Sequence, residues 1–257
     1  MYLHRTIDIT LLEWKNSEKR KPLLLRGARQ VGKTDSVRNL SKSFEYFIEL
    51  NFEEDDRAGR IFTESLNADV LCEKITAVYD IPVTEGKTLL FLDEIQSCVR
   101  AIQSLRYFYE KKQGLHVIAA GSLLEFALQE IPSFGVGRIR SVFMHPMSFN
   151  EFVKALGRDN ILEMKKAAAP EKPLSGAIHS ELLSLMKKFL LIGGMPEVVA
   201  NYITHKDISE CRRVMDDLIL SYRSDFAKYK DKFPLRILTE VFNSVVKQAG
   251  SKFVYSK

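Results

Sequence analysis

Residues 21–34, KPLLLRGARQVGKT, constrain the fold of this chain more than any other feature. The apolar run at 22–25 shows no polar alternation, which is typical of a strand buried on both faces of a parallel sheet. The part that follows fits the pattern G-x-x-x-x-G-K-[ST] at every fixed position. We predict that all eight of its residues bind a nucleotide: Gly27, Ala28, Arg29, Gln30, Val31, Gly32, Lys33 and Thr34.

Each fixed residue of this loop has a chemical reason. Glycines let the backbone turn tightly and approach a phosphate without a Cβ in the way. The loop N–H groups and the start of the helix expected at 34–40 together form a cradle for anions. Within this cradle Lys33 reaches the β- and γ-phosphates, and the Thr34 hydroxyl is a ligand for Mg²⁺.

Residues 88–94, TLLFLDE, are the second chemical landmark, about sixty residues after the loop. A buried apolar strand ends here in two adjacent carboxylates, and neighbouring side chains at a strand end point to opposite sides. We therefore assign Asp93 to the metal and Glu94 to the base that activates water. A strand that ends in a charged turn is the simpler alternative, but the preceding loop argues against it.

Two further candidates follow a strand expected at 115–120. Ser122 lies at the tip of this strand, which points at the γ-phosphate in P-loop ATPases that insert a strand between the loop strand and the acidic strand. The same Gly-Ser pair is also typical of a helix start, and 123–128 has a helical pattern. In SFGVGRIR, glycines precede Arg138 and Arg140, either of which can stabilise phosphoryl charge in cis or from a neighbouring subunit. An ordinary surface arginine is the alternative.

The pattern of strands and helices predicts an α/β P-loop fold. Further strands are expected at 46–52 and 141–144, so that five parallel strands form a sheet sandwiched by helices. After residue 146 the chain becomes helical: a capping box at 148–151, a linker at 165–176, and helices at 177–192, 208–229 and 234–248. We expect a P-loop core at 1–146, a helical lid at 147–205, and the start of a C-terminal domain at 206–257.

Composition excludes several classes of protein. Hydrophobic residues make up 46% of the 257 residues and charged residues 28%, as in globular proteins. No run approaches the about 18 apolar residues of a membrane span, and no signal peptide is evident, so we expect no membrane partner. The three cysteines, Cys72, Cys98 and Cys211, are scattered and odd in number, so we expect a reduced, cytoplasmic protein. The net charge is +5, and residues 206–257 hold eleven Lys or Arg against seven Asp or Glu. That excess of +4 favours an acidic partner such as nucleic acid, with a solvated helical face as the alternative.

Taken together, the pieces LLLRGARQVGKT, LLFLDEIQ, VIAAGSLL, GVGRI…MHPMSFNEF and LIGGMPEVV resemble the bacterial and archaeal AAA-type ATPases that carry a C-terminal domain of unknown function. The resemblance implies that Asp93 and Glu94 are the Walker B pair, that Ser122 is the sensor, and that Arg138 is an arginine finger. Because its loop precedes the last strand, on the far side of the sheet from Asp93, we expect Arg138 to act on a neighbouring subunit in a homo-oligomer. It also implies that the turn at 193–196 is a lid element whose proline, Pro196, packs near the adenine. An adenine-side arginine usual in such lids has no obvious counterpart here.

The resemblance also bears on length and function. Members of this family continue into a winged helix and a nuclease-like fold, so we expect this chain to be a fragment or an unusually short member. The implied function is ATP binding and Mg²⁺-dependent hydrolysis that drives a switch in a C-terminal effector domain. The alternative is a nucleotide-gated interaction or DNA-binding switch with little turnover. A GTPase is disfavoured because no N-K-x-D motif is present: His205-Lys206-Asp207 is the nearest string and fails at its first position.

Overall fold

The computed structural model describes residues 1–122, 124, 128, 137–229 and 233–251. Its contacts divide the chain into two compact units, Met1–Pro196 and Glu197–Lys257. The division groups residues 147–196 with the P-loop core, so the lid expected at 147–205 is shared between the two units.

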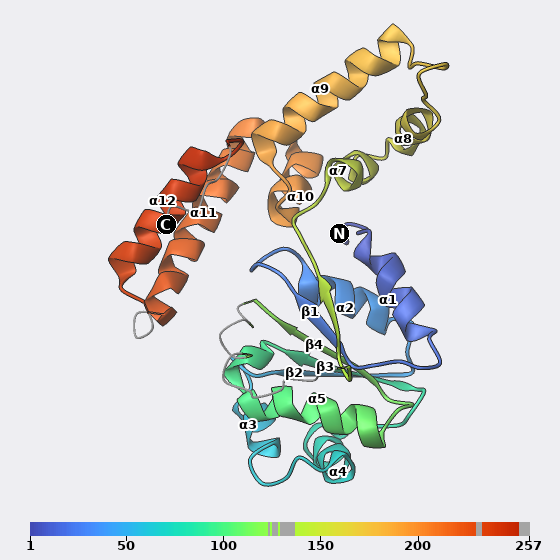
Figure 1. The fold of residues 1–257 in the computed structure, drawn as a ribbon, viewed down its shortest axis with the longest axis vertical. Helices are drawn as coiled ribbons and strands as arrows, with labels where there is room; N and C mark the ends of the chain where they lie inside the picture. The colour runs from blue at the N-terminus through green and yellow to red at the C-terminus, as the bar shows by residue number, and fades with distance from the viewer. Residues whose placement is uncertain (123, 125–127, 129–136, 230–232, 252–257) are drawn as a thin grey trace. The chain divides into compact units, whose positions relative to one another are not determined.

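The first unit alternates strands and helices and then becomes helical (Figure 1). Its elements in chain order are α1 (Ile7–Lys15), β1 (Leu23–Arg26), α2 (Lys33–Ser41), β2 (Tyr46–Asn51), α3 (Asp56–Ile61), α4 (Ala68–Tyr79), β3 (Thr88–Asp93), η1 (Ile95–Ser97), α5 (Val99–Lys111), β4 (His116–Gly121), β5 (Arg140–Phe143), α7 (Phe149–Ala155), α8 (Asp159–Lys166) and α9 (Gly176–Ile192).

The five strands form one parallel sheet in the order β2-β3-β4-β1-β5. This confirms the predicted five-stranded parallel sheet, with β4 inserted between the loop strand β1 and the acidic strand β3. Because all strands run the same way, the loop after β1 and the carboxylates at the end of β3 both lie at the carboxyl ends of the strands, which we call the site edge of the sheet. The start of β5 lies at the opposite edge.

Helices cover both faces of the sheet, which explains why the inner strands β1, β3 and β4 are largely apolar and buried. Leu24 of β1 packs in a core with α3, α4 and α5, while its neighbours Leu23 and Leu25 pack in a second core with α1 and α2 (Figure 1). The β3 residues divide in the same way, with Leu90 and Leu92 on the first side and Leu89 and Phe91 on the second. These two cores fix the edge of the sheet that carries the site.

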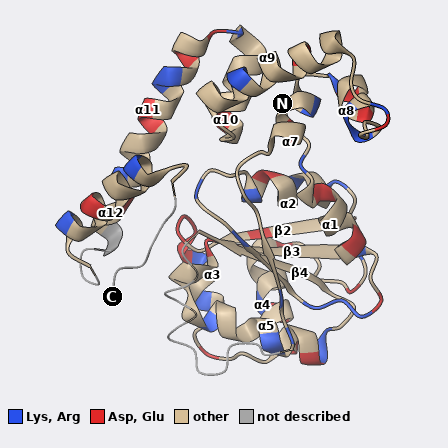
Figure 2. Ribbon diagram, turned by 45° about the horizontal axis from the view of Figure 1, so that its top comes forward, with Lys and Arg blue, Asp and Glu red and all other residues tan. Residues whose placement is uncertain are grey.

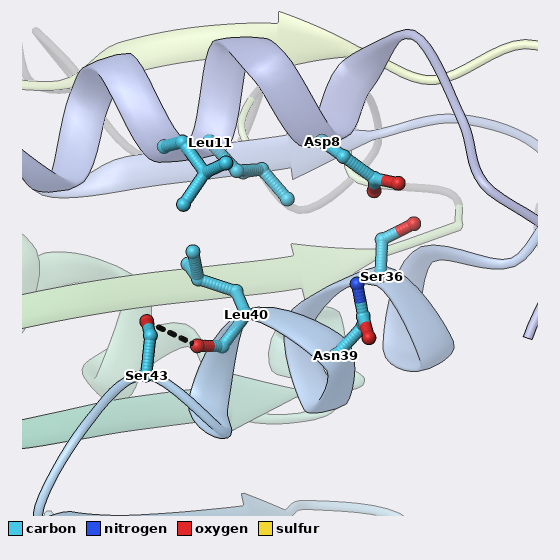
Figure 3. A pocket seen from close by; sticks show the side chains of 7 residues that line it. Asp8, Leu11, Ser36, Asn39, Leu40 and Ser43 are labelled. Carbon is cyan, nitrogen blue, oxygen red and sulfur yellow. Dashed lines mark hydrogen bonds between the residues drawn. The ribbon is translucent and has the colours of Figure 1, made fainter.

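Helix α1 packs on α2, the helix that follows the P-loop. The Tyr2 hydroxyl donates to the Asp8 carboxylate and contacts the Ser36 hydroxyl. Figure 3 shows a small pocket in this seam, where Asp8 and Leu11 of α1 face Ser36, Asn39 and Leu40 of α2. The Ser43 hydroxyl donates to the Leu40 carbonyl at 2.7 Å. No P-loop residue lines this pocket, so the seam is a packing interface next to the site and not the site itself.

The helices after β5 begin with the expected capping box. The Ser148 hydroxyl accepts from the Glu151 N–H, and the Glu151 carboxylate accepts from the Ser148 N–H. The expected linker is shorter than predicted, because α8 includes Lys165 and Lys166 in its last turn. Basic side chains at this position complement the negative end of the helix dipole, a stabilising effect that a linker reading overlooks.

The second unit is helical: α10 (Pro196–His205), α11 (Ile208–Asp225), η2 (Phe226–Tyr229) and α12 (Leu235–Gln248). Figure 2 shows acidic residues interspersed with basic ones along α11 and α12. Two of the arginines pair within their own helices, Arg213 with Glu210 at 2.7 Å and Arg236 with Glu240 at 2.9 Å. Among the described residues, no helix combines the length and apolar character that a membrane crossing requires.

Candidate nucleotide-binding site

The P-loop leaves β1 and enters α2 through a backbone that only certain residues accept. Gly27 has φ 149° and Gly32 has φ 94°, both in a region that side chains rarely adopt. A Cβ on Gly27 would overlap the carbonyl oxygen of Met144, which lies just after β5. Gly27 is therefore required by the close approach of two backbones as well as by the turn.

Lys33 and Thr34 are the first two residues of α2, and the side chains of both make hydrogen bonds at this end of the sheet. Lys33 Nζ donates to the carbonyls of Gly27 at 2.9 Å and Ala28 at 2.8 Å. Burial lowers the pKa of Lys33, and the charges of Glu94 and Asp93 only partly offset that effect. The ammonium group thus lies inside the loop and within reach of an anion that enters it.

Thr34 and Asp93 meet at the edge of the sheet. The Thr34 hydroxyl donates to the Asp93 carboxylate at 2.8 Å. Burial raises the pKa of Asp93, and the nearby Glu94 charge adds to the rise, while the bond from Thr34 lowers it. A hydroxyl and a carboxylate at one point supply hard oxygen ligands, which suits Mg²⁺, so the residues present fit the cation that the motif implies.

Glu94 follows Asp93 in a left-handed backbone conformation, with φ 49° and ψ 42°. Its carboxylate accepts a hydrogen bond from the amide of Gln96 at 2.6 Å. Among the charges that act on Lys33, that of Glu94 is the strongest. The turn therefore places the Glu94 carboxylate next to Asp93, and its role as a base stays a prediction.

Ser122 directly follows β4, at the same edge as the P-loop and Asp93. Its hydroxyl oxygen is buried and has no hydrogen-bond partner within the described part of the chain. Ser122 thus follows a strand that lies between the loop strand β1 and the acidic strand β3, and its role as a sensor stays a prediction. Most of the helix expected at 123–128 lies outside the described residues.

Arg138 and Arg140 lie near the start of β5, at the amino ends of the strands, whereas the P-loop lies at the carboxyl ends. Arg138 Nε pairs with the Glu110 carboxylate of α5 at 2.8 Å. Arg140 is the first residue of β5 and is exposed. The structure does not bring either arginine to the P-loop of its own chain, and residues 133–136 of the expected loop lie outside the described residues.

Pro196 packs against the P-loop. A Cβ on Gly32 would lie 3.7 Å from Pro196 Cγ. The turn before it is anchored, because the Gly194 carbonyl accepts from the Met147 N–H at 2.6 Å and a Cβ on Gly194 would overlap the Met147 carbonyl. The predicted lid proline thus lies beside the loop that is to hold the nucleotide.

Sequence reasoning missed two residues at this site, Arg5 and Gln96. Arg5 is buried and donates to the carbonyls of Val31 and His145, both at 2.7 Å, and to the Glu151 carboxylate at 3.2 Å. It therefore joins the N-terminal segment to the P-loop and to the capping box of α7. Arg5 was missed because no periodic pattern distinguishes a single arginine near a terminus. Gln96 did have a signal in the sequence, since it belongs to the motif LLFLDEIQ.

Two protein families match different parts of this chain. A family model described as an AAA domain matches residues 19–153, and one described as a domain of unknown function, DUF8612, matches residues 183–257. Comparison with curated proteins finds no match.

Two solved structures are similar to this chain, and the first of them supports the fold. The Walker-type ATPase paby2304 of Pyrococcus abyssi matches with a TM-score of 0.55 and 18% identity, over 90% of this chain and 77% of that chain. A signal transduction ATPase with numerous domains and a tetratricopeptide repeat sensor, PH0952 from Pyrococcus horikoshii, matches with a TM-score of 0.41 and 14% identity, over 77% of this chain and 29% of that chain. The AAA match covers just over half of the 257 residues and includes the P-loop and the end of β3, so the chain belongs to the AAA domain family.

Proposed function

We propose that this chain binds ATP together with Mg²⁺ and hydrolyses it, and that turnover drives a conformational switch in the helical region after the core. One observation carries the proposal: the Thr34 hydroxyl bonds the Asp93 carboxylate at 2.8 Å, with Glu94 beside them. The side chains that we assign to phosphate, metal and base therefore lie close together at the carboxyl ends of the strands. The AAA family membership supports the same activity.

The chemistry follows from the position of each side chain. A water oxygen attacks the γ-phosphorus, and the bond from phosphorus to the bridging oxygen breaks, with its electron pair leaving on ADP. Glu94 accepts the proton of that water, and Lys33 neutralises charge on the γ-phosphate. Thr34 and Asp93 would hold Mg²⁺, which supplies further positive charge against the phosphate oxygens when bound. Ser122 at the tip of β4 is the group we assign to contact with the γ-phosphate.

Steady-state ATP turnover tests this function, together with the thermal stabilisation that ATP and Mg²⁺ produce. A site filled at 100 times its dissociation constant adds about 2.7 kcal/mol to the free energy of unfolding. Lys33→Ala should lose that stabilisation, whereas Lys42→Ala, the same change at the end of α2, should keep it. Glu94→Gln should bind ATP but lose turnover, with Glu73→Gln on α4 as the matched control. Asp93→Asn should weaken the Mg²⁺ dependence of binding.

Two outcomes would contradict the proposal. Equal stabilisation of wild type and Lys33→Ala by ATP would place the nucleotide elsewhere. Wild-type turnover no faster than that of Glu94→Gln would favour the alternative function, a nucleotide-gated switch with little hydrolysis.

We further propose that Arg138 completes the site of a second copy of this chain. It lies at the edge of the sheet opposite its own P-loop and is held there by Glu110, so its reach favours a neighbouring subunit. An arginine supplied in trans contributes about 10³ to 10⁵ in rate in other P-loop enzymes.

The charge excess of +4 in residues 206–257 motivates a further proposal, that nucleic acid binds there. ATP turnover measured with and without DNA tests it.

A further inference from the structure

Gln96 lies between the base and the tip of β4. Its Nε2 group donates to the Glu94 carboxylate at 2.6 Å and lies 3.5 Å from the carboxylate of Glu53. An ionised carboxylate only accepts hydrogen bonds, so the NH₂ end of the Gln96 amide must face Glu94. This fixes the orientation of the amide and directs its oxygen, Oε1, the other way.

The oxygen of that amide packs on the last residue of β4. A Cβ on Gly121 would overlap Gln96 Oε1, so the absence of a side chain at Gly121 makes room for the amide. Oε1 is buried and, among the residues that the structure describes, accepts no hydrogen bond. The next residue, Ser122, has a buried hydroxyl in the same condition. Two orphaned polar atoms at one strand tip cost free energy unless water or a ligand pairs with them.

The backbone before Gln96 is shaped to make this contact. Glu94 adopts a left-handed conformation, which is unfavourable for a residue with a Cβ, and the Asp93 carboxylate accepts from the Glu94 N–H at 3.0 Å to hold the turn. Such strain persists where the surrounding structure enforces it, and it concentrates at functional sites. Here the strained turn sets the Glu94 carboxylate against the amide of Gln96.

We propose that Gln96 positions the catalytic base: one end of its amide holds the Glu94 carboxylate, and the other end accepts a hydrogen bond from the water that Glu94 activates. This rests on the proposed ATP hydrolysis. One water proton then points to Glu94 and the other to Gln96 Oε1, which leaves an oxygen lone pair free for the γ-phosphorus. The Ser122 hydroxyl, adjacent to Gly121, lies at the same strand tip and can donate to the water or to the phosphate.

Two variants separate the hydrogen bond from simple packing. Gln96→Ala removes the whole amide, whereas Gln96→Glu keeps its shape but replaces the donor to Glu94 with a second carboxylate. Gln103→Ala on α5 is the matched control for the first change. Misplacing a reacting group by about 1 Å costs about 10²-fold in rate. We expect both Gln96 variants to lower kcat about 30- to 100-fold, while KM for ATP changes less than about threefold.

A second measurement does not depend on turnover. ADP with aluminium fluoride mimics the γ-phosphoryl group under attack, whereas a slowly hydrolysed ATP analogue mimics the ground state. Each variant is titrated with fluorescently labelled forms of both states, and its melting midpoint without nucleotide is recorded. We expect the Gln96 variants to keep the affinity for the ATP analogue and to lose at least tenfold in retention of the aluminium fluoride complex. The control should match wild type in every measurement.

The possible failures are distinguishable. If wild type hydrolyses ATP and both Gln96 variants do so within threefold of its kcat, the role of Gln96 is overturned while the proposed function stands. Equal losses of affinity for both nucleotide states would mean that Gln96 is structural and would also overturn the inference. If wild type itself shows no turnover, the proposed function and the role of Gln96 fail together.

Discussion

Replacing Arg5 with methionine removes a guanidinium group that contacts three separate parts of the first unit. Arg5 is 7% exposed and donates to the carbonyl of Val31 in the P-loop, to the carbonyl of His145 after β5, and to the Glu151 carboxylate of α7. Methionine fills similar volume without any donor. The change therefore isolates the hydrogen bonds and the charge from the packing of the side chain.

The magnitude follows from what the variant leaves behind. Breaking a buried ion pair by removing one partner costs about 3–5 kcal/mol, because the remaining charge is buried without compensation. Glu151 keeps two donors, the N–H groups of Thr6 and Ser148 at 2.6 and 2.7 Å, so its carboxylate is not stranded. Two carbonyls lose a donor in addition. We therefore expect a loss near the lower end of the range, about 3 kcal/mol in the free energy of unfolding.

The matched control is Arg38→Met, which removes a geometrically better ion pair on the surface. Arg38 donates twice to Glu49, at 2.7 and 2.9 Å, but its side chain is 56% exposed. Exposed pairs contribute about 0.2–1 kcal/mol, since water and salt screen both charges. The two substitutions thus test whether burial of an ion pair contributes more to the free energy of unfolding than a short distance between its charged atoms.

Urea unfolding followed by far-ultraviolet circular dichroism measures both free energies, with unchanged m-values required for the comparison. The Arg5 variant should lose at least about 2 kcal/mol more than the Arg38 variant. Losses equal to within about 0.5 kcal/mol would refute the reasoning, because burial would then add nothing to the worth of the pair. A double variant with Glu151→Gln should lose less than the sum of the single changes.

Two further predictions concern acid stability and assembly. Burial and the Arg20 charge lower the pKa of His116 from 6.5 to about 4. Between pH 6.5 and pH 4, His116 is therefore protonated in the unfolded chain but neutral in the folded chain. Stability present above pH 6.5 is thus lost as the pH falls toward 4. Between pH 7.5 and 4.5, His116→Phe should therefore lose about 2–3 kcal/mol less free energy of unfolding than wild type, as measured by urea unfolding. Equal losses in the two proteins would contradict this prediction. Mixing Arg138→Ala with Lys33→Ala chains should restore part of the turnover that neither shows alone, because each mixed pair holds one intact composite site, whereas no rescue would mean that Arg138 does not act in trans.

Much of the fold could be predicted from sequence because its signals are local. The loop pattern, the five apolar runs and the capping box at Ser148 and Glu151 each depend on residues within a few positions of one another. Strand ends shifted by one residue, as when β1 proved to be Leu23–Arg26 and not 22–25. The ends of parallel strands depend on register with their neighbours: Arg26 pairs with both Gly121 and Phe143, and no local pattern records that pairing.

The site divides in the same way. From the sequence alone, chemistry and spacing singled out Lys33, Thr34, Asp93 and Glu94, since a phosphate loop and a strand ending in carboxylates are local arrangements. Only the tertiary structure joined Arg5 to Val31 and Glu151, residues 26 and 146 positions away. The amide of Gln96 likewise needed the folded sheet, because Gly121 comes beside it only once β4 has paired with β3. Hydrogen bonds between distant segments depend on the tertiary fold. The local sequence around a single polar side chain therefore does not indicate which partner the fold will bring next to it.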